Sequence, residues 1–366
     1  MFAQHKTRPD LALSLIVLGL AVTLTALVGC ASATTPGAVT SDAAQTSSPL
    51  PATTPDVTQT PMRMPPAPTL VVRSSPTPEA LDFRTFLPAA PPGFGELANH
   101  LLFFSNRSGR HQLYQIALDG SGLVQLTNNP AYDAYDIEPA WSTDGKIGFT
   151  STHVNGWWEV FVLYPDGGPP IQLTDFDADS WSLAWSPDGG SLAFVSNATG
   201  DDEIYLVTLD GGTPVNLTQQ SDADDFLPVW SPTGEQIVFV SDREREQDIF
   251  VMAPDGSAVR RITDAEGRDT SPNWSPDGDR IAFVTDRDGN FEVYLMNADG
   301  SDPVRLTHNG AYEWSPTWSP DGQLIAFTST REHHETYDLY VMAPDGSNQT
   351  RLTSDPANDI IPRWWP

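Results

Sequence analysis

The sequence predicts an all-β fold: a six-bladed β-propeller, closed by a C-terminal strand that completes the first blade and preceded by a disordered linker. Glycine (27) and proline (33) make about a sixth of the 366 residues, which favours many turns over long helices. Short apolar runs recur without a helical period. One tryptophan also returns about every 44 residues, at Trp141, Trp185, Trp230, Trp274, Trp318 and Trp364.

Each repeat opens with a strand that ends in this tryptophan. A proline stands two residues before it in five of six repeats, with Leu183 as the exception. We expect proline to be tolerated there because the innermost strand leaves one edge unpaired, facing the central channel. A turn such as "WSPDG" follows, in which proline fixes φ and glycine allows a positive φ. The chain continues with strands such as "IAFVT" and "VYLM", a second glycine turn such as "ADGS", and a last strand ending in "LT".

The central strands of each repeat are apolar on both faces, so each sheet must be covered on both sides. The repeats hold no helical segment of adequate length, and sheets must therefore stack on sheets, as in a radial array of small sheets. The first repeat begins at "LLFFS" with no Pro-x-Trp strand before it, and the last Pro-x-Trp strand has nothing after it. We predict that residues 101–127 and a strand around residues 361–365 form one blade and close the ring.

Units such as "PNWSPDGDRIAFVTDRDGNFEVYLMNADGSDPVRLT" resemble the repeats of TolB-type propeller proteins, a family of exported six-bladed propellers. The resemblance covers residues 101–366 and recurs six times. It implies the fold and a location outside the cytoplasm. Related propellers serve as partner-binding subunits, as gating domains of serine peptidases and occasionally as enzymes, so the resemblance alone does not choose between binding and catalysis.

The first 29 residues have the layout of a lipoprotein-type signal peptide. A basic start is followed by the apolar run "LALSLIVLGLAVTLTALVGC", which ends at Cys30, the one cysteine of the chain. Residues 27–30 resemble the bacterial lipobox, so we expect cleavage before Cys30 and a lipid anchor on its sulfur. A run of about 19 residues is also long enough to remain as an uncleaved membrane anchor. Both alternatives place the rest of the chain outside the cytoplasmic membrane.

Residues 30–95 are predicted to be a disordered linker rich in Pro, Thr, Ala and Ser. Thirteen prolines lie between residues 31 and 92, among few apolar residues, and such a composition cannot bury a core. The linker would hold the propeller, predicted at residues 96–366, away from the membrane. As an alternative, the segment "LDFRTFLP" at residues 81–88 packs on the following domain.

The charge of the chain restricts its partners. With 48 acidic and 19 basic residues the formal charge is −29, so the folded surface repels phosphate backbones, and we expect no nucleic acid partner. The sequence indicates no cofactor, no metal and no catalytic residue. We expect a monomer that binds a protein or a cell-wall glycan and contacts the membrane through the lipid anchor.

One face of the predicted disc carries loops of varied composition: the hairpins after "FVS" and the connections from "LT" to the next Pro-x-Trp. We call it the long-loop face, and binding usually resides on such loops. Five residues before the tryptophan, five of six repeats carry an acid at the expected mouth of the channel: Asp136, Asp225, Asp269, Glu313 and Asp359. These acids either bind a cation or a basic segment of a partner, or accept backbone N–H bonds that fix the loops.

The position one residue before these acids varies, which suits a contact surface. It holds Tyr135, Asp179, Asp224, Arg268, Tyr312 and Asn358. The pair Trp157 and Trp158 adds aromatic surface that no turn requires, although Trp158 also suits the start of a strand. The candidate partner-binding residues are therefore the five acids together with Tyr135, Tyr312 and Trp157.

A catalytic function is the alternative to binding. The sequence contains no Gly-x-Ser-x-Gly nucleophile turn and no phosphate-binding glycine loop. A polysaccharide lyase or hydrolase would need a site built from loop acids and histidines. His333 and His334 in "REHHETYD" have donors for zinc, although a solvated charged loop also explains them. We therefore predict a membrane-anchored extracytoplasmic binding scaffold, not an enzyme, that engages its partner through the long-loop face.

Overall fold

The structure is a computed structural model that describes residues 100–126, 136–152, 157–164, 170–210, 212–219, 222–333 and 336–364. These residues fall within one compact unit, Thr69–Pro366. The predicted signal peptide, Cys30 and the predicted linker lie outside the described residues. Across the described ranges the regular elements are all β-strands. The same ranges contain no helix that is long and apolar enough to span a membrane.

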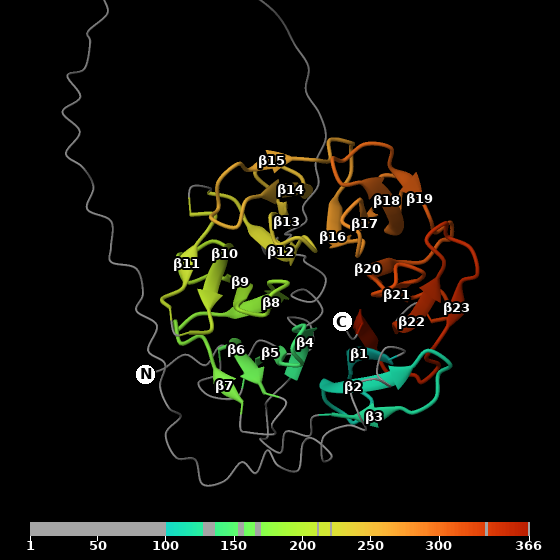
Figure 1. Cartoon of the computed structure of the whole chain (residues 1–366). Coiled ribbons are helices and arrows are strands. Elements are labelled where there is room, and N and C mark those ends of the chain that lie inside the picture. Colours follow the sequence, from blue (N-terminus) through green and yellow to red (C-terminus); the bar gives the residue numbers. More distant parts are fainter. Residues whose placement is uncertain are drawn as a thin grey trace, which may run out of the picture. The chain divides into compact units, whose positions relative to one another are not determined.

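The described residues form six antiparallel four-stranded sheets, the blades of a β-propeller (Figure 1), which confirms the predicted fold. In each blade a six-residue strand lies innermost and a two-residue strand lies at the rim. From the innermost strand outwards, blade one consists of β24 (Asp359–Trp364), β1 (His100–Ser105), β2 (Gln112–Ala117) and β3 (Val124–Gln125), and blade two of β4 (Asp136–Trp141), β5 (Ile147–Ser151), β6 (Glu159–Leu163) and β7 (Ile171–Gln172). Blade three consists of β8 (Ser180–Trp185), β9 (Ser191–Ser196), β10 (Glu203–Thr208) and β11 (Val215–Asn216), and blade four of β12 (Asp225–Trp230), β13 (Ile237–Ser241), β14 (Asp248–Met252) and β15 (Arg260–Arg261). Blade five consists of β16 (Asp269–Trp274), β17 (Arg280–Thr285), β18 (Glu292–Asn297) and β19 (Val304–Arg305), and blade six of β20 (Glu313–Trp318), β21 (Ile325–Ser329), β22 (Asp338–Met342) and β23 (Thr350–Arg351).

The C-terminal strand closes the ring as predicted. β24 pairs antiparallel with β1, and Leu101 lies opposite Trp364. Trp364 packs in a buried cluster with Phe103 of its own blade and Leu339 of blade six. Its indole Nε1 donates to the carbonyl oxygen of Thr317 in blade six, at 3.0 Å. The last strand therefore completes the first blade and joins it to the last blade.

The core of the protein lies between the blades. The second strands β5, β13 and β21 are buried along their whole length. A buried cluster joins Val195 and Ile204 of blade three to Phe239 and Phe250 of blade four. Similar clusters join blades two and three, four and five, five and six, and six and one. Neighbouring sheets thus cover the strands that are apolar on both faces.

Each innermost strand contains a β-bulge, which the sequence analysis did not predict. In blade four the register with β13 shifts between Phe226 and Val229, and Leu227 has a φ of 53°. The equivalent residue of every other blade also has a positive φ: Glu138, Ser182, Ser271, Ser315 and Ile361. In five blades the next residue is the proline, whose missing N–H is tolerated in the irregular part of the ladder. The bulge therefore adds to the predicted reason, an unpaired channel edge, for the presence of proline.

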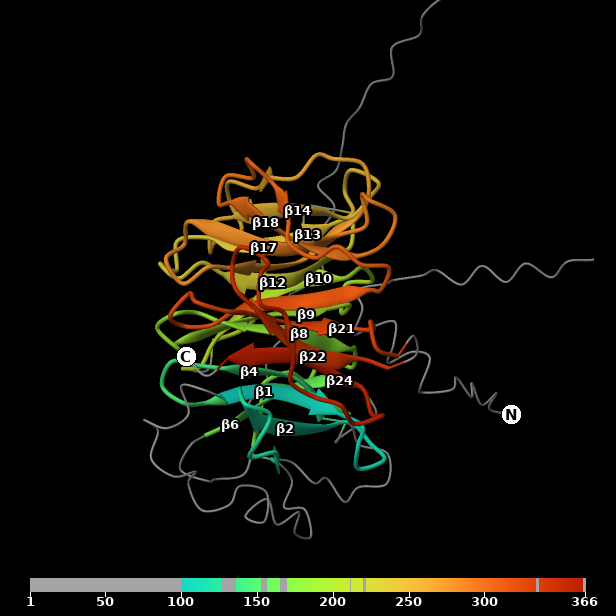
Figure 2. The ribbon, with the colours of Figure 1, turned by 90° about the vertical axis from the view of Figure 1, so that its right-hand side faces the viewer.

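The loops divide between the two faces of the disc, which Figure 2 shows from its rim. One face carries tight turns. In the "WSPDG" turn of blade three, Ser186 Oγ donates to Asp188 Oδ1 at 2.6 Å, and Gly189 has a φ of 68°. On the long-loop face, the two kinds of loop contact each other. The N–H of Asn358, in a connection between blades, donates to Asn106 Oδ1, in a hairpin, at 2.9 Å.

Candidate functional site

Four of the five predicted acids begin innermost strands and are buried. Each has an exposed fraction of 0%: Asp225, Asp269, Glu313 and Asp359. This burial differs from the expected open ring at the channel mouth. The fifth acid, Asp136, begins β4, and its side chain falls outside the described part of the structure. Tyr135 also lies outside the described residues.

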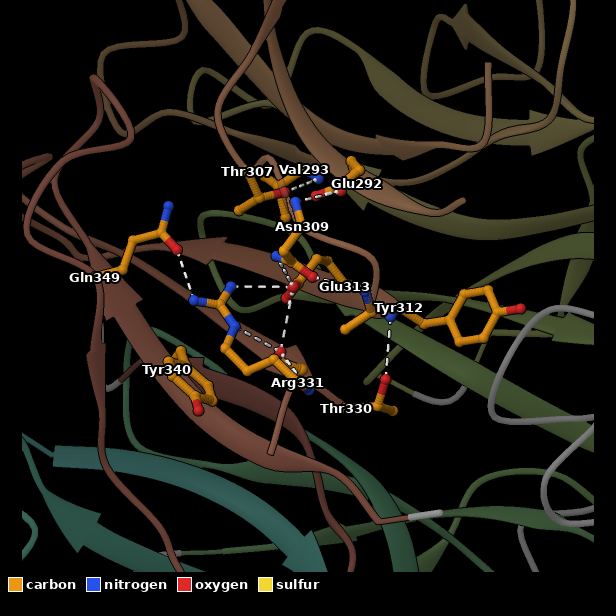
Figure 3. A network of polar contacts seen from close by, with 12 residues as sticks. Glu292, Val293, Thr307, Asn309, Tyr312, Glu313, Thr330, Arg331, Tyr340 and Gln349 are labelled. Carbon is orange, nitrogen blue, oxygen red and sulfur yellow. Dashed lines mark hydrogen bonds and ion pairs between the residues drawn. The ribbon is translucent and has the colours of Figure 1, made fainter. Parts of the chain in front are cut away.

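Each of the four buried acids forms an ion pair with an arginine that follows the second strand of its blade. In blade six (Figure 3), Arg331 Nε donates to Ser329 Oγ at 2.9 Å, and its guanidinium carbon lies 4.4 Å from the ring centroid of Tyr340. The charge of each acid is therefore neutralised within its own blade. The pairs are Arg107–Asp359 (2.6 Å), Arg243–Asp225 (2.9 Å), Arg287–Asp269 (2.9 Å) and Arg331–Glu313 (3.0 Å).

These contacts favour a bracing role for the acids. The donors include arginine guanidinium groups and, for Glu313, also the side chains of Asn309 and Ser329, whereas the sequence analysis expected backbone N–H groups. Burial raises the pKa of Glu313, and the charge of Arg331 and the amide of Asn309 oppose this rise. A carboxylate that is buried and paired in this way contributes little to the potential outside the protein. Direct recognition of a partner by these acids stays a prediction.

Blade three lacks both members of this ion pair. Ser180 stands in place of the acid, and Ala198 stands in place of the arginine. In blades one, four, five and six the guanidinium lies over aromatic rings of the two central strands. In blade three Phe176 takes this place, with its ring centroid 5.6 Å from that of Tyr205 and 6.1 Å from that of Phe194. In blade three, both members of the ion pair are therefore replaced by uncharged residues, and an aromatic ring fills the place of the guanidinium.

A second set of buried acids begins third strands, and the sequence analysis missed it. Three of them pair with an arginine of the outermost strand, two residues before a conspicuous threonine in the "LT" or "IT" motif. That arginine is the signal from which the pairs could have been predicted. The pairs are Arg261–Asp248 (2.8 Å), Arg305–Glu292 (2.8 Å) and Arg351–Asp338 (2.9 Å).

Two of the predicted contact residues are exposed on the long-loop face. Trp157 is 42% exposed and Tyr312 is 50% exposed. In Figure 3 the ring of Tyr312 points away from the buried network, and its backbone N–H donates to Thr330 Oγ1 at 3.0 Å. Trp158 is buried and directly precedes β6. The two exposed aromatic residues belong to blades two and six, with blade one between them.

Four acids of blades three and four form a cluster on the long-loop face. The N–H of Asp202 donates to Asp224 Oδ1 at 3.1 Å, and the N–H of Asp224 donates to Asp242 Oδ1 at 3.0 Å. Asp179 Oδ1 accepts from the N–H of Trp158 at 2.9 Å. Burial raises the pKa of Asp202 to about 7, and the charges of Asp224 and Asp179 add to this rise. We call Asp179, Asp202, Asp224 and Asp242 the acidic cluster; within the described residues none of them forms an ion pair.

The equivalent positions of other blades are neutral or compensated. In blade five Arg268 pairs with Asp286 at 2.9 Å. In blades six and one the side chains are uncharged: Tyr312, Thr330, Asn358 and Asn106. The described residues contain no group of three or more His, Cys, Asp or Glu side chains that could hold a metal ion. At these positions, the acids without an ion pair among the described residues therefore lie on blades three and four.

Two charged residues of the innermost strands have no counterpart in the repeats. Glu138 in β4 is 6% exposed, and its Oε2 accepts from the N–H of Ser182 in the next blade at 2.6 Å. Burial raises the pKa of Glu138 to about 7 and lowers the pKa of Arg363 in β24 to about 10. Their mutual attraction opposes both shifts. Sequence reasoning missed this pair because neither residue recurs from blade to blade.

The chain resembles known proteins in sequence and in structure. The family described as TolB beta propeller domain matches residues 137–267 and 221–336. TolB from Acinetobacter baumannii is similar with a TM-score of 0.63 and 24% identity, over 74% of this chain and 67% of that chain. A putative TolB from Agrobacterium tumefaciens is similar with a TM-score of 0.57 and 24% identity, over 73% and 98%. An oligogalacturonate lyase in complex with manganese is similar with a TM-score of 0.50 and 15% identity, over 71% and 75%.

At these identities the structural similarities establish a shared fold and nothing more about activity. No curated protein matches the sequence. The two family matches together span more than half of the 366 residues, within the ring of blades that the structure shows. The chain therefore belongs to the TolB β-propeller domain family.

Proposed function

We propose that the protein is a membrane-anchored extracytoplasmic scaffold that binds a protein or another component of the cell envelope through its long-loop face. Membership in the TolB propeller family supports a protein-binding role outside the cytoplasm. The alternative, a polysaccharide lyase or hydrolase, rests on similarity of fold alone. We also propose that the protein acts as a monomer and without a cofactor.

The observation that carries this proposal is the uneven charge of the long-loop face. The acids repeated at the strand starts are buried and paired, whereas the acidic cluster of blades three and four has no arginine of its own. Trp157 lies beside this cluster, because the next residue, Trp158, donates its N–H to Asp179. Carboxylates next to an exposed indole suit a basic segment of a partner, which the charge of −29 would also attract from a distance.

Replacing Asp179, Asp202 and Asp224 together with Asn is expected to weaken binding and to flatten its dependence on salt. The melting temperature should stay within a few degrees, because asparagine keeps the Oδ1 through which Asp179 and Asp224 accept backbone N–H groups, and because burial and neighbouring charges already disfavour the ionised form of Asp202. Asn358 shows such an acceptor at the equivalent position, where its Oδ1 accepts from the N–H of Tyr337 at 3.1 Å. The measurement is a pull-down from intact envelopes, identification by mass spectrometry, and titration of the captured partner at two salt concentrations.

The matched control is the triple change of Asp225, Asp269 and Asp359 to Asn, which removes the same charge from buried, paired positions. It should lower the melting temperature and leave the affinity of the folded protein unchanged. Unchanged affinity in the triple variant of the acidic cluster would contradict the proposed surface. If the control variant loses affinity at an unchanged melting temperature, the buried acids Asp225, Asp269 and Asp359 would instead be the residues that bind the partner.

The proposed anchor is tested at Cys30. Because the thiol accepts the lipid and the sequence has no second cysteine, Cys30→Ser should block both acylation and removal of residues 1–29. The full-length protein should then keep its amino terminus and lose its lipid mass, as measured by intact-protein mass spectrometry. Wild-type protein with an intact amino terminus and no added lipid would instead support the uncleaved anchor. Stable attachment would rest on more than one acyl chain.

A further inference from the structure

One buried acid of the second set, Glu203 in blade three, has no arginine opposite it. In blades four to six the outermost strand supplies an arginine at this place, and in blade three it supplies Asn216. Blade one has lost both members, because Gln112 and Gln125 stand in place of the acid and the arginine. Blade three therefore contains the carboxylate, that of Glu203, but not the arginine that pairs with the equivalent acid in blades four to six.

Blade five shows what normally fills this place. The guanidinium of Arg305 donates through Nη2 to Glu292 Oε1 at 2.8 Å and through Nη1 to Asp288 Oδ2 at 3.1 Å. The hydroxyl of Tyr294, opposite Arg305 in the sheet, donates to the same Asp288 oxygen. The tyrosine hydroxyl, the guanidinium and the buried acid therefore lie together at the long-loop end of the blade.

In blade three the same positions carry polar groups without partners. Tyr205 lies opposite Asn216, is 2% exposed, and has a buried hydroxyl that forms no hydrogen bond. The Nδ2 of Asn216 is also buried and without a partner, while its Oδ1 accepts from the N–H of Thr218 at 2.9 Å. Glu203 is 4% exposed, and its hydrogen bond comes from the hydroxyl of Thr218 to Oε2.

The charges around Glu203 do not compensate its carboxylate. Burial raises the pKa of Glu203 to about 7; the hydroxyl of Thr218 opposes this rise, Asp225 and Asp201 add to it, and Arg243 opposes it. Arg243 is already paired with Asp225 at 2.9 Å. A burial-raised pKa means that the ionised form lacks stabilisation, which a cation from outside would supply.

We propose that blade three binds an arginine residue of a partner between Glu203, Tyr205 and Asn216. The guanidinium would donate to the carboxylate of Glu203 and to the hydroxyl oxygen of Tyr205. The Nδ2 of Asn216 would donate to a main-chain carbonyl of the partner. The ring of Phe176, 5.6 Å from that of Tyr205, adds an aromatic surface on which a planar guanidinium packs better than an ammonium.

Blade two does not offer the same set of groups. It keeps an acid, Glu159, opposite an outer strand with Gln172, but carries Phe161 where blade three has Tyr205. The tyrosine hydroxyl is therefore particular to blade three among the two blades whose outermost strand carries no arginine opposite the acid. The inference rests on the proposed function only for the identity of the molecule that carries the arginine.

The test uses the full chain and a small probe, N-acetylargininamide, titrated at pH 8 and followed by NMR. We expect saturable binding that shifts the signals of Tyr205, and weaker binding of the neutral isostere N-acetylcitrullinamide and of N-acetyllysinamide. Glu203→Gln should lower the affinity at least about tenfold, the size expected for loss of a charged hydrogen-bond partner. Glutamine fits this place, because Gln112 occupies it in blade one. Affinity should also fall as the pH drops below 7, because Glu203 then becomes protonated.

Asn216→Arg is the matched variant, because it places in the outermost strand of blade three the arginine that blades four to six contain at this position. It should abolish binding of the probe and raise the melting temperature. The inference is wrong if the probe does not bind, if the citrulline or lysine probe binds as tightly, or if Glu203→Gln or Asn216→Arg leaves the affinity unchanged. Failure of the probe leaves the pull-down test of the acidic cluster intact, so the two proposals fail separately.

Discussion

Deletion of residues 359–366 is expected to abolish cooperative folding of the propeller. The deletion removes β24, the innermost strand of blade one. Loss of the burial of Ile360, Ile361 and Trp364 costs about 1.5–3 kcal/mol for each side chain. Arg107, which lies 2.6 Å from Asp359, would lose its partner at a further cost of about 3–5 kcal/mol. The sum is as large as the whole free energy of unfolding of an ordinary domain, about 5–15 kcal/mol.

The measurement is thermal unfolding followed by near-ultraviolet circular dichroism of the tryptophans. The control deletes residues 365 and 366 only, which leaves β24 complete and should leave the melting temperature nearly unchanged. A synthetic peptide with the sequence DIIPRWWP should restore part of the signal when it is added to the longer deletion. An unchanged melting temperature for the longer deletion would refute closure by β24.

The second large effect is expected at the buried ion pair of blade four. Asp225→Ser leaves Arg243 without its carboxylate, and Arg243→Ala leaves Asp225 buried and unpaired, so each single change should cost about 3–5 kcal/mol. The double variant reproduces the pair Ser180 and Ala198, which blade three already contains. We expect it to be more stable than the sum of the single changes predicts, with an interaction energy of about 1–3 kcal/mol.

Urea unfolding of the wild type, the two single variants and the double variant gives this interaction energy. The control cycle uses Arg268→Ala and Asp286→Asn, a pair whose side chains are 37% and 22% exposed. There the interaction energy should stay below about 1 kcal/mol, as is usual for ion pairs near the surface. Additive changes at Asp225 and Arg243 would show that the pair does not brace the blade.

Much of the fold was predictable because its signals are local. The glycine turns and the doubly apolar strands each depend on a few neighbouring residues, and the tryptophan that returns about every 44 residues shows that they recur along the chain. Together these signals require stacked sheets. Closure followed from comparing the two chain ends. The β-bulge was not predictable in the same way, since Leu227 gives no sign in the sequence of its positive φ.

The burial of the acids was harder to predict because it depends on residues that become neighbours only after folding. Asp225 meets Arg243 across a hairpin, 18 positions along the chain, and Asp359 meets Arg107 across 252 positions. In the sequence, an acidic residue at the start of a strand looks identical whether its carboxylate faces water or pairs with an arginine. The arginine that recurs two residues after the second strand was the missing signal. For Glu203, even an alignment of the repeats would not reveal the buried hydroxyl of Tyr205.

The pairing of β24 with β1 also has a consequence for the order in which the molecule folds. The contact between Arg107 and Asp359 spans 252 positions, and contacts so distant in sequence form slowly because a long loop must close before they are gained. During synthesis from the amino terminus, β1 emerges long before β24, so its inner edge stays open, whereas each later blade receives its four strands from one continuous stretch of the chain. The blade that is made first is thus the last to be completed, and its open edge needs protection from other chains until then.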